Sequence, residues 1–489
     1  MIRACTFVLF CLALCIAIVA AERTASARHT DGTSQAAPAT PIPIGTIISK
    51  VATLAAADQT YALYLPSNYS PARRWPIIYV FAPDARGDIP AALMKPAAEQ
   101  FGYIIAASNN SKNGPWKPEA EAAQALFNDT HDRLAIDEQR IYFAGFSGGA
   151  RVASQLAQSC KCAQAVFLNG ATFSTGAQPS TQDSFAIYLT AGLLDFNYPE
   201  LAAFDARLET LAIPHFLRRF EGGHQWAPME IWSEALAWAD LLAMKTAHKE
   251  RDANVVTAQL ATFAAIAQKF QQGGDDYFAW QFLRATRSTF AGLTDITPIE
   301  QQAAAMEKTA SVRAGQKREK DEAIRQQAME DAVYRAFSPI NSETADRNAV
   351  VQQTTQEVIQ LRERAVHEKN PDQRRVIERA RRAVFAYFIE SGEPLINSTD
   401  PFLARIYISL AAEAIPEASW PQLVLARCDA KMGRKKDAIR DLQKAVSLGL
   451  TTEDIAAIPT ESPELSGLSG DPEFQKVAAA AKPAKPPSR

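Results

Sequence analysis

The sequence is poor in the residues that build disulfide scaffolds and metal centres. It has six cysteines and six histidines in 489 residues, with no Cys-x-x-Cys pair and no His-Glu-x-x-His motif. So few cysteines cannot staple a chain of this length, and without those motifs no metal site is predicted. The sequence also has no large excess of one charge, because it contains 51 basic and 54 acidic residues. The chain therefore has no basic footprint for a nucleic-acid partner.

The N-terminus has the pattern of a secretory signal. A positive charge precedes a run over 4–21 that is apolar but for Thr6, and there are two small-residue cleavage sites, at 19–21 and 25–27. This pattern predicts a signal peptide over 1–27, and hence a secreted or periplasmic protein. The alternative is a retained membrane helix, because an apolar run of that length can just span a bilayer. A flexible leader rich in Ala, Thr, Ser and Pro is expected over 28–45.

Signal removal would leave half of the cysteines. Cys160 and Cys162 are separated by one residue, which is too close for an easy mutual bridge. With Cys428 the number is odd, so we expect at least one free thiol unless the protein pairs with another chain. The cysteines that would be lost are Cys5, Cys11 and Cys15.

Up to residue 248 the hydrophobic pattern alternates between strands and helices. Several apolar runs are continuous, as in strands buried on both faces. The strand-like runs lie at 61–65, 76–81, 103–107, 140–144, 165–168, 186–190 and 215–220. Helical spacers lie between most of them, at 118–134, 149–158 and 199–212. This alternation predicts an α/β domain over 46–248 with a mainly parallel sheet flanked by helices.

Beyond residue 248 the strand-like runs stop and helical periodicity continues. Helices are predicted at 254–272, 276–292, 299–336, 349–368, 371–390, 401–414, 420–432 and 434–448. We therefore expect an all-α domain over 249–480 and a disordered tail over 481–489. Part of it resembles a tetratricopeptide repeat, in which small residues recur where two helices pack closely. The matching residues are Leu425, Ala426, Gly433, Ala438, Leu442 and Ala445. Two roles stay open for this domain, partner docking or a helical appendage on the first domain.

One motif indicates nucleophilic chemistry. Residues Gly145-Phe146-Ser147-Gly148-Gly149 fit G-x-S-x-G, a pattern short enough to arise by chance. Its setting is more specific, because a predicted strand runs into it and a predicted helix leaves it. A nucleophile elbow needs this setting, in which flanking glycines make room for a sharp turn. Ser147 is therefore the predicted nucleophile; glycines that serve only packing are the alternative.

A serine hydroxyl needs a base to accept its proton. Of the six histidines, His224 is best placed, because it follows the last predicted strand at the edge where α/β sheets place their ligands. The base in turn needs an acid to fix its tautomer. Asp195 follows the strand at 186–190 and lies at the same edge. The less well placed acids are Asp205 and Glu209 in a helix and Glu221 at a strand end.

The three candidate residues occur along the chain in the order Ser147, Asp195, His224. In this order the chain resembles the α/β-hydrolase family, whose catalytic triad runs serine, acid, histidine. Over 46–248 it looks like secreted carboxylesterases of the feruloyl-esterase and polyhydroxybutyrate-depolymerase kind. The motifs behind this likeness are Tyr61-Ala62-Leu63-Tyr64-Leu65-Pro66, Trp75-Pro76-Ile77-Ile78-Tyr79-Val80-Phe81, the G-x-S-x-G string and Gly223-His224-Gln225-Trp226. The resemblance implies hydrolysis of a small-molecule or polymer-linked carboxylic ester through an acyl-enzyme, without a cofactor.

The sequence departs from this family after the third strand. Such enzymes usually carry His-Gly there, near a backbone N–H that helps to bind the oxyanion, but this chain has Pro83, which has no N–H. The resemblance then leaves the backbone of Asp84 or Ala85 as one donor and that of Gly148 as the second. Asn109, Asn110 and Trp116 follow the next strand and are candidates to line the pocket.

Two other functions stay open on the sequence. A serine peptidase of the same fold would use the same three residues on an amide. A non-catalytic adaptor would bind a partner through the helical repeat domain and keep an inert hydrolase fold. Neither function requires nucleic acid or, after signal removal, a membrane.

Overall fold

The computed structural model describes residues 42–174 and 176–483. The predicted signal peptide and most of the leader lie outside these ranges, as do residues 484–489. Within them, none of the helices combines the length and the apolar character needed to cross a membrane.

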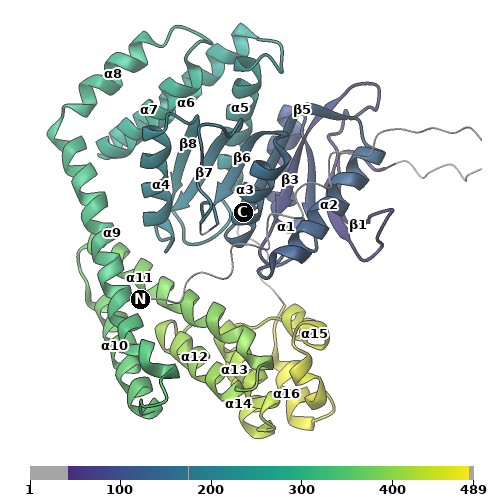
Figure 1. Cartoon of the computed structure of the whole chain (residues 1–489), viewed down its shortest axis with the longest axis vertical. Coiled ribbons are helices and arrows are strands. Elements are labelled where there is room, and N and C mark those ends of the chain that lie inside the picture. Colours follow the sequence, from purple (N-terminus) through teal and green to yellow (C-terminus); the bar gives the residue numbers. More distant parts are fainter. Residues whose placement is uncertain (1–41, 175, 484–489) are drawn as a thin grey trace, which may run out of the picture. The chain divides into compact units, whose positions relative to one another are not determined.

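Eight strands form one sheet in the order β1-β2-β4-β3-β5-β6-β7-β8 (Figure 1). β1 and β2 are antiparallel additions at one edge, and every pair from β4 to β8 is parallel. Every residue of β3, β6 and β7 is buried, which explains their continuous apolar runs. The bounds are β1 Ile47–Ala52, β2 Thr60–Tyr64, β3 Trp75–Phe81, β4 Ile104–Ser108, β5 Ile136–Phe146, β6 Ala163–Asn169, β7 Ala186–Gly192 and β8 His215–Phe220.

Five helices flank the sheet: α1 Asp88–Phe101, α2 Trp116–Arg133, α3 Gly148–Cys160, α4 Tyr198–Thr210 and α5 Met229–Lys245. The predicted architecture, a mainly parallel sheet between helices followed by a helical region, is thus confirmed. The sequence did not predict α1, which contains Pro96 in its interior, a residue that normally ends a helix. It also missed β1, an edge strand whose residues are partly exposed.

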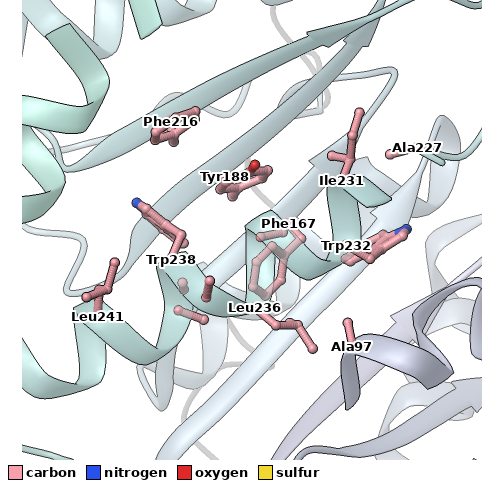
Figure 2. Packing of buried hydrophobic residues seen from close by; sticks show 14 of the residues in the cluster. Ala97, Phe167, Tyr188, Phe216, Ala227, Ile231, Trp232, Leu236, Trp238 and Leu241 are labelled. Carbon is pink, nitrogen blue, oxygen red and sulfur yellow. The ribbon is translucent and has the colours of Figure 1, made fainter. Parts of the chain in front are cut away.

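The sheet and the first helices beyond residue 248 share one apolar core. Figure 2 shows Trp232 and Trp238 of α5 on either side of Phe167 from β6, with ring centroids 5.8 and 6.2 Å from that phenylalanine. The same core continues through Phe263 and Phe282, which meet Phe216 of β8 edge-on at 5.7 and 5.1 Å. The helices that carry these two rings are α6 Ala253–Gln272 and α7 Asp276–Phe290. The helical part therefore begins by covering the sheet, and the division at 248 stays a prediction.

The remaining helices form two further apolar clusters. They are α8 Thr297–Glu307, α9 Ala310–Phe337, α10 Arg347–His367, α11 Pro371–Gly392, α12 Pro401–Ala414, α13 Trp420–Lys431, α14 Lys435–Ser447, α15 Thr452–Glu461 and α16 Pro472–Ala480. The prediction of a single helix over 299–336 is wrong, because α8 ends at Glu307 and α9 begins at Ala310. The side chain of Thr309 caps α9 by accepting a hydrogen bond from Val312 N.

The helix pair α13–α14 contains the predicted repeat. Ala426, Ala438, Leu442 and Ala445 are fully buried in the last cluster, and Gly433 turns the chain between the helices with a φ of 74°. Whether this pair is a tetratricopeptide repeat stays a prediction. In the predicted tail, the backbone oxygen of Lys482 accepts a hydrogen bond of 3.0 Å from Thr452 N.

Cys160 and Cys162 form a disulfide, so the expectation that they are too close to bridge is wrong. Their Cα atoms lie 5.1 Å apart, within the range that a disulfide spans. Lys161 between them adopts the left-handed conformation, with a φ of 53°, and so folds the chain back at the end of α3. Cys428 is free and buried among the residues that the structure describes.

Candidate active site

Ser147 occupies the sharp turn between β5 and α3. Its φ of 54° and ψ of −122° are rare for a residue with a side chain. A Cβ on Gly145 would lie 2.0 Å from the carbonyl oxygen of Gly149, and a Cβ on Gly149 would lie 2.0 Å from that of Phe81. Both positions therefore need glycine, because the backbone passes too close for any side chain.

His224 lies between Ser147 and Asp195 and hydrogen-bonds to both. Its Nε2 is 2.8 Å from Ser147 Oγ, and its Nδ1 is 2.9 Å from Asp195 Oδ1. A carboxylate can only accept, so Nδ1 carries the proton and Nε2 is left to accept from the serine hydroxyl. The structure thus brings together the three residues that the sequence singled out.

The loops that carry the acid and the histidine are joined through their backbones. Leu193 N donates to Phe220 O at 2.9 Å, and Leu194 N donates to Gly222 O at 2.8 Å. A Cβ on Gly192 would lie 2.3 Å from the carbonyl oxygen of Gly223. Since β7 and β8 are parallel neighbours, their carboxyl ends place both loops at one edge, beside the turn after β5.

Asp195 is fully buried. Its Oδ1 also accepts from Asn197 N at 2.8 Å, while Oδ2 has no hydrogen-bond partner in the structure. Phe146 and Phe196 pack on the His224 ring, with centroids at 4.6 and 4.3 Å. The acid side of the histidine is therefore buried, and its Nε2 faces Ser147.

A cavity of about 610 Å³ opens at Ser147, a volume typical of small-molecule sites. Trp116, one of the three pocket candidates, lines it. Asn109 and Asn110 instead brace the antiparallel edge of the sheet through Ser49 O and Thr60 N. The lining comes from the segment after β4, the start of α3, the acid loop and the helical part: Ser111, Lys112, Asn113, Gly114, Trp116, Glu119, Ser147, Gly148, Gly149, Arg151, Val152, Gln155, Ser174, Phe196, Asn197, Glu390, Glu393 and Pro394.

The three residues considered as backbone donors to the oxyanion do not all lie at the cavity. Gly148 lines the cavity next to Ser147, whereas the described lining includes neither Asp84 nor Ala85. Asp84 forms an isolated antiparallel bridge with Lys112, and Ala85 has a φ of 59°. The backbone after β3 is therefore tied to the loop after β4, and the second donor stays a proposal.

Sequence reasoning missed the contribution of the helical part. Glu390 near the end of α11, and Glu393 and Pro394 directly after that helix, line the cavity although they lie far along the chain from the predicted triad. No local pattern could have assigned them to it. A second charged feature, the pair of Arg151 with Glu200 at 3.2 Å, lies at the cavity wall. Within the described ranges, no group of three or more His, Cys, Asp or Glu residues is arranged to hold a metal ion.

No protein-family model matches the chain, and no curated protein matches it. Several solved structures are similar to part of it. An esterase from Pyrobaculum calidifontis is 13% identical over 41% of this chain and 87% of its own, with a TM-score of 0.34. A ferulic acid esterase is 17% identical over 39% of this chain and 95% of its own, with a TM-score of 0.33. The feruloyl esterase module from Clostridium thermocellum is 14% identical over 40% and 88%, with a TM-score of 0.31. Likeness this distant carries no argument about activity.

Proposed function

We propose that the protein is a serine hydrolase that cleaves a carboxylic ester through an acyl-enzyme. The observation that carries this proposal is the hydrogen-bonded series Ser147–His224–Asp195, which opens on a cavity at the serine. A base hydrogen-bonded to a hydroxyl, and itself oriented by a carboxylate, is the arrangement that activates a serine.

The proposed reaction has two halves. As Ser147 Oγ attacks the ester carbonyl carbon, its proton passes to His224 Nε2 and the carbonyl π electrons move onto oxygen. The tetrahedral intermediate collapses, the bond to the alcohol breaks, and His224 returns the proton to the leaving oxygen. Water then attacks the acyl carbonyl carbon and loses a proton to His224. The second tetrahedral intermediate collapses, the bond to Ser147 Oγ breaks, His224 returns the proton to that oxygen, and the carboxylic acid is released. Asp195 stays ionised and stabilises the charged histidine.

The oxyanion would be held by the backbone N–H of Gly148 and by a second donor. We assign the second donor to Asp84 or Ala85, since Pro83 has no N–H. Losing one such donor costs about 10²–10³ in rate. A weak second donor would therefore lower the efficiency of this enzyme without changing its chemistry.

Backbone strain favours an enzyme over an inert adaptor. The conformation of Ser147 costs about 1–3 kcal/mol, and an adaptor has no use for a strained serine that is hydrogen-bonded to a histidine. The helical part lines the cavity through Glu390 and Glu393. That favours an appendage to the site over a free docking module.

The proposal is tested by the hydrolysis of p-nitrophenyl butyrate. We expect Ser147→Ala to lower kcat/KM by about 10³-fold or more. The matched control is Ser159→Ala, which alters an exposed serine near the far end of α3, and it should retain wild-type activity. A peptidyl p-nitroanilide cleaved faster than the ester would favour the peptidase. Ester hydrolysis that is equal in wild type and Ser147→Ala would contradict the proposal.

We also propose that the protein is secreted or periplasmic. The signal-like pattern over 1–27 supports this, as does the disulfide between Cys160 and Cys162, since such bonds persist in oxidising compartments. N-terminal sequencing of the protein from its native host tests it. A start near residue 22 or 28 is expected, and an intact Met1 would contradict cleavage.

A further inference from the structure

The cavity at Ser147 has more acidic than basic side chains. Three carboxylates line it, from Glu119, Glu390 and Glu393, against the two cations of Lys112 and Arg151. Two of these five charges have partners outside the lining. Arg151 is bound by Glu200 through both terminal nitrogens, at 3.3 and 3.2 Å.

The second compensated charge is Glu393, which lies 3.3 Å from Arg427 in an ion pair. Glu119 Oε1 accepts from the backbone N of Lys112 at 2.7 Å, and burial raises the pKa of this carboxyl although Ser111 and Lys112 lower it in part. Glu390 is then left as the carboxylate with no hydrogen bond or ion pair in the described structure. Burial raises the pKa of Glu390, and the nearby charges of His224 and Arg151 lower it by less.

Glu119 and Ser111 are two further buried groups in the cavity wall, 3% and 1% exposed. Glu119 Oε2 and Ser111 Oγ have no partner at full hydrogen-bond geometry, but the Ser111 hydroxyl lies near enough to Glu119 to lower the pKa of its carboxyl. These two side chains therefore face each other, and Glu390 is the lining carboxylate whose charge favours a cationic ligand.

Aromatic side chains border the same space. Trp116 and Phe196 both line the cavity, and the Phe196 ring also packs on His224. An aromatic face attracts a cation through its quadrupole, most strongly for tryptophan. Carboxylate and aromatic faces together are what an ammonium group needs, and a neutral alkyl group of equal size would gain nothing from Glu390.

We propose that the ester hydrolysed at Ser147 carries a cationic ammonium group, which lies against Glu390 of α11 and the faces of Trp116 and Phe196. This inference rests on the proposed function and adds the substrate class. It assigns a role to the helical part, which supplies the charge that selects the substrate.

The test compares two esters of equal shape, butyrylcholine and its uncharged carbon analogue 3,3-dimethylbutyl butyrate. We expect wild-type kcat/KM to favour the cation by about fivefold, the upper range for a solvent-accessible ion pair. The preference should fall as salt rises, because ions screen the attraction. Glu390→Gln should bring the ratio of the two kcat/KM values close to one, and Glu390→Asp should restore part of it. Glu357→Gln removes an equal charge from α10, outside the cavity lining, and should leave the ratio unchanged.

A binding arm separates this inference from the proposed function. Titration calorimetry with Ser147→Ala measures the intact esters without turnover. Tighter binding of butyrylcholine that is lost in Ser147→Ala/Glu390→Gln supports the inference, even if neither ester is hydrolysed and the proposed function fails. Hydrolysis that depends on Ser147 but shows no preference for the cation overturns the inference and leaves the hydrolase standing. Equal binding of both esters overturns it as well.

Discussion

Gln326 of α9 donates a hydrogen bond of 2.8 Å from Nε2 to the carbonyl oxygen of Phe196, the residue directly after Asp195. Gln326 is 3% exposed, so the helical part holds the acid loop from a buried position. Arg379 of α11 donates to Leu193 O in the same loop at 3.5 Å, and its guanidinium lies 4.7 Å from the ring of Tyr198 at the start of α4. The helices after the sheet therefore help to place the acid that orients His224.

This contact predicts that Gln326→Met lowers kcat for p-nitrophenyl butyrate by about tenfold with a smaller change in KM. The loop that carries Asp195 would lose its hydrogen bond to Gln326, while the residues that line the cavity stay the same. Small displacements of catalytic groups lower the rate strongly. Gln327→Met is the control, because Gln327 bonds only to Asp331 in an exposed pair. If kcat stays at the wild-type value in Gln326→Met, the helical part does not position the acid.

A buried ionic network joins the sheet to α9. Arg219 at the end of β8 is 3.2 Å from Glu319, which also accepts from Tyr198 and Tyr277 at 2.6 and 2.7 Å. Glu319→Leu would leave Arg219 buried and uncompensated, so we expect a loss of about 3 kcal/mol in the free energy of unfolding.

Urea denaturation measures this loss. Asp321→Asn breaks an exposed pair with Lys317 on the same helix and should cost less than about 1 kcal/mol. Equal effects of the two substitutions would show that the network adds nothing beyond a surface ion pair.

The pair of His215 with Asp205 predicts a pH-dependent stability. Burial lowers the pKa of His215, but the hydrogen bond and charge of Asp205 outweigh it and raise the pKa overall. Burial likewise raises the pKa of Asp205, and His215, Arg219 and Arg284 outweigh it, so that pKa is lowered. The contribution of His215 to the free energy of unfolding is fully present below the pKa that this histidine has in the unfolded chain. It is lost as the pH rises through the higher pKa that the histidine has in the folded protein. The aspartate contribution is lost as pH falls.

Wild type should therefore exceed His215→Gln in unfolding free energy by more at about pH 5.5 than at about pH 9. The control is His367→Gln, which alters a histidine with 77% side-chain exposure and should give a small difference at both values. If the difference in unfolding free energy between wild type and His215→Gln were larger at about pH 9 than at about pH 5.5, a charged His215–Asp205 pair would be contradicted.

Gly148 predicts a coupling with Asn113. A Cβ on Gly148 would lie 1.8 Å from Asn113 Oδ1, with no backbone atom among its near neighbours. Because a side chain can move, Gly148→Ala should fold and lose activity by displacing the amide in the cavity. Asn113→Ala/Gly148→Ala should recover part of that loss, with a coupling of about 1 kcal/mol in a double-mutant cycle. Strict additivity would mean that the two residues do not interact.

Local patterns were enough to propose the three residues of the triad, because each of them follows a strand. Ser147, Asp195 and His224 come after β5, β7 and β8, and parallel strands bring their carboxyl ends to one edge. Glu390 and Gln326 gave no such signal, since only the packing of distant helices places them at the site. The spacing of Cys160 and Cys162 was misleading, because their disulfide depends on the left-handed conformation of Lys161. Lysine has no preference for that conformation, so the sequence could not predict it.

The central claim is that Ser147 is the activated nucleophile of this protein. Treatment of the full chain with a fluorophosphonate, followed by peptide mass spectrometry, tests it most directly. We expect one adduct, on the peptide that contains Ser147, with labelling abolished in Ser147→Ala and strongly slowed in His224→Ala. Wild-type protein that folds but forms no adduct, or an adduct that persists in Ser147→Ala, would contradict it.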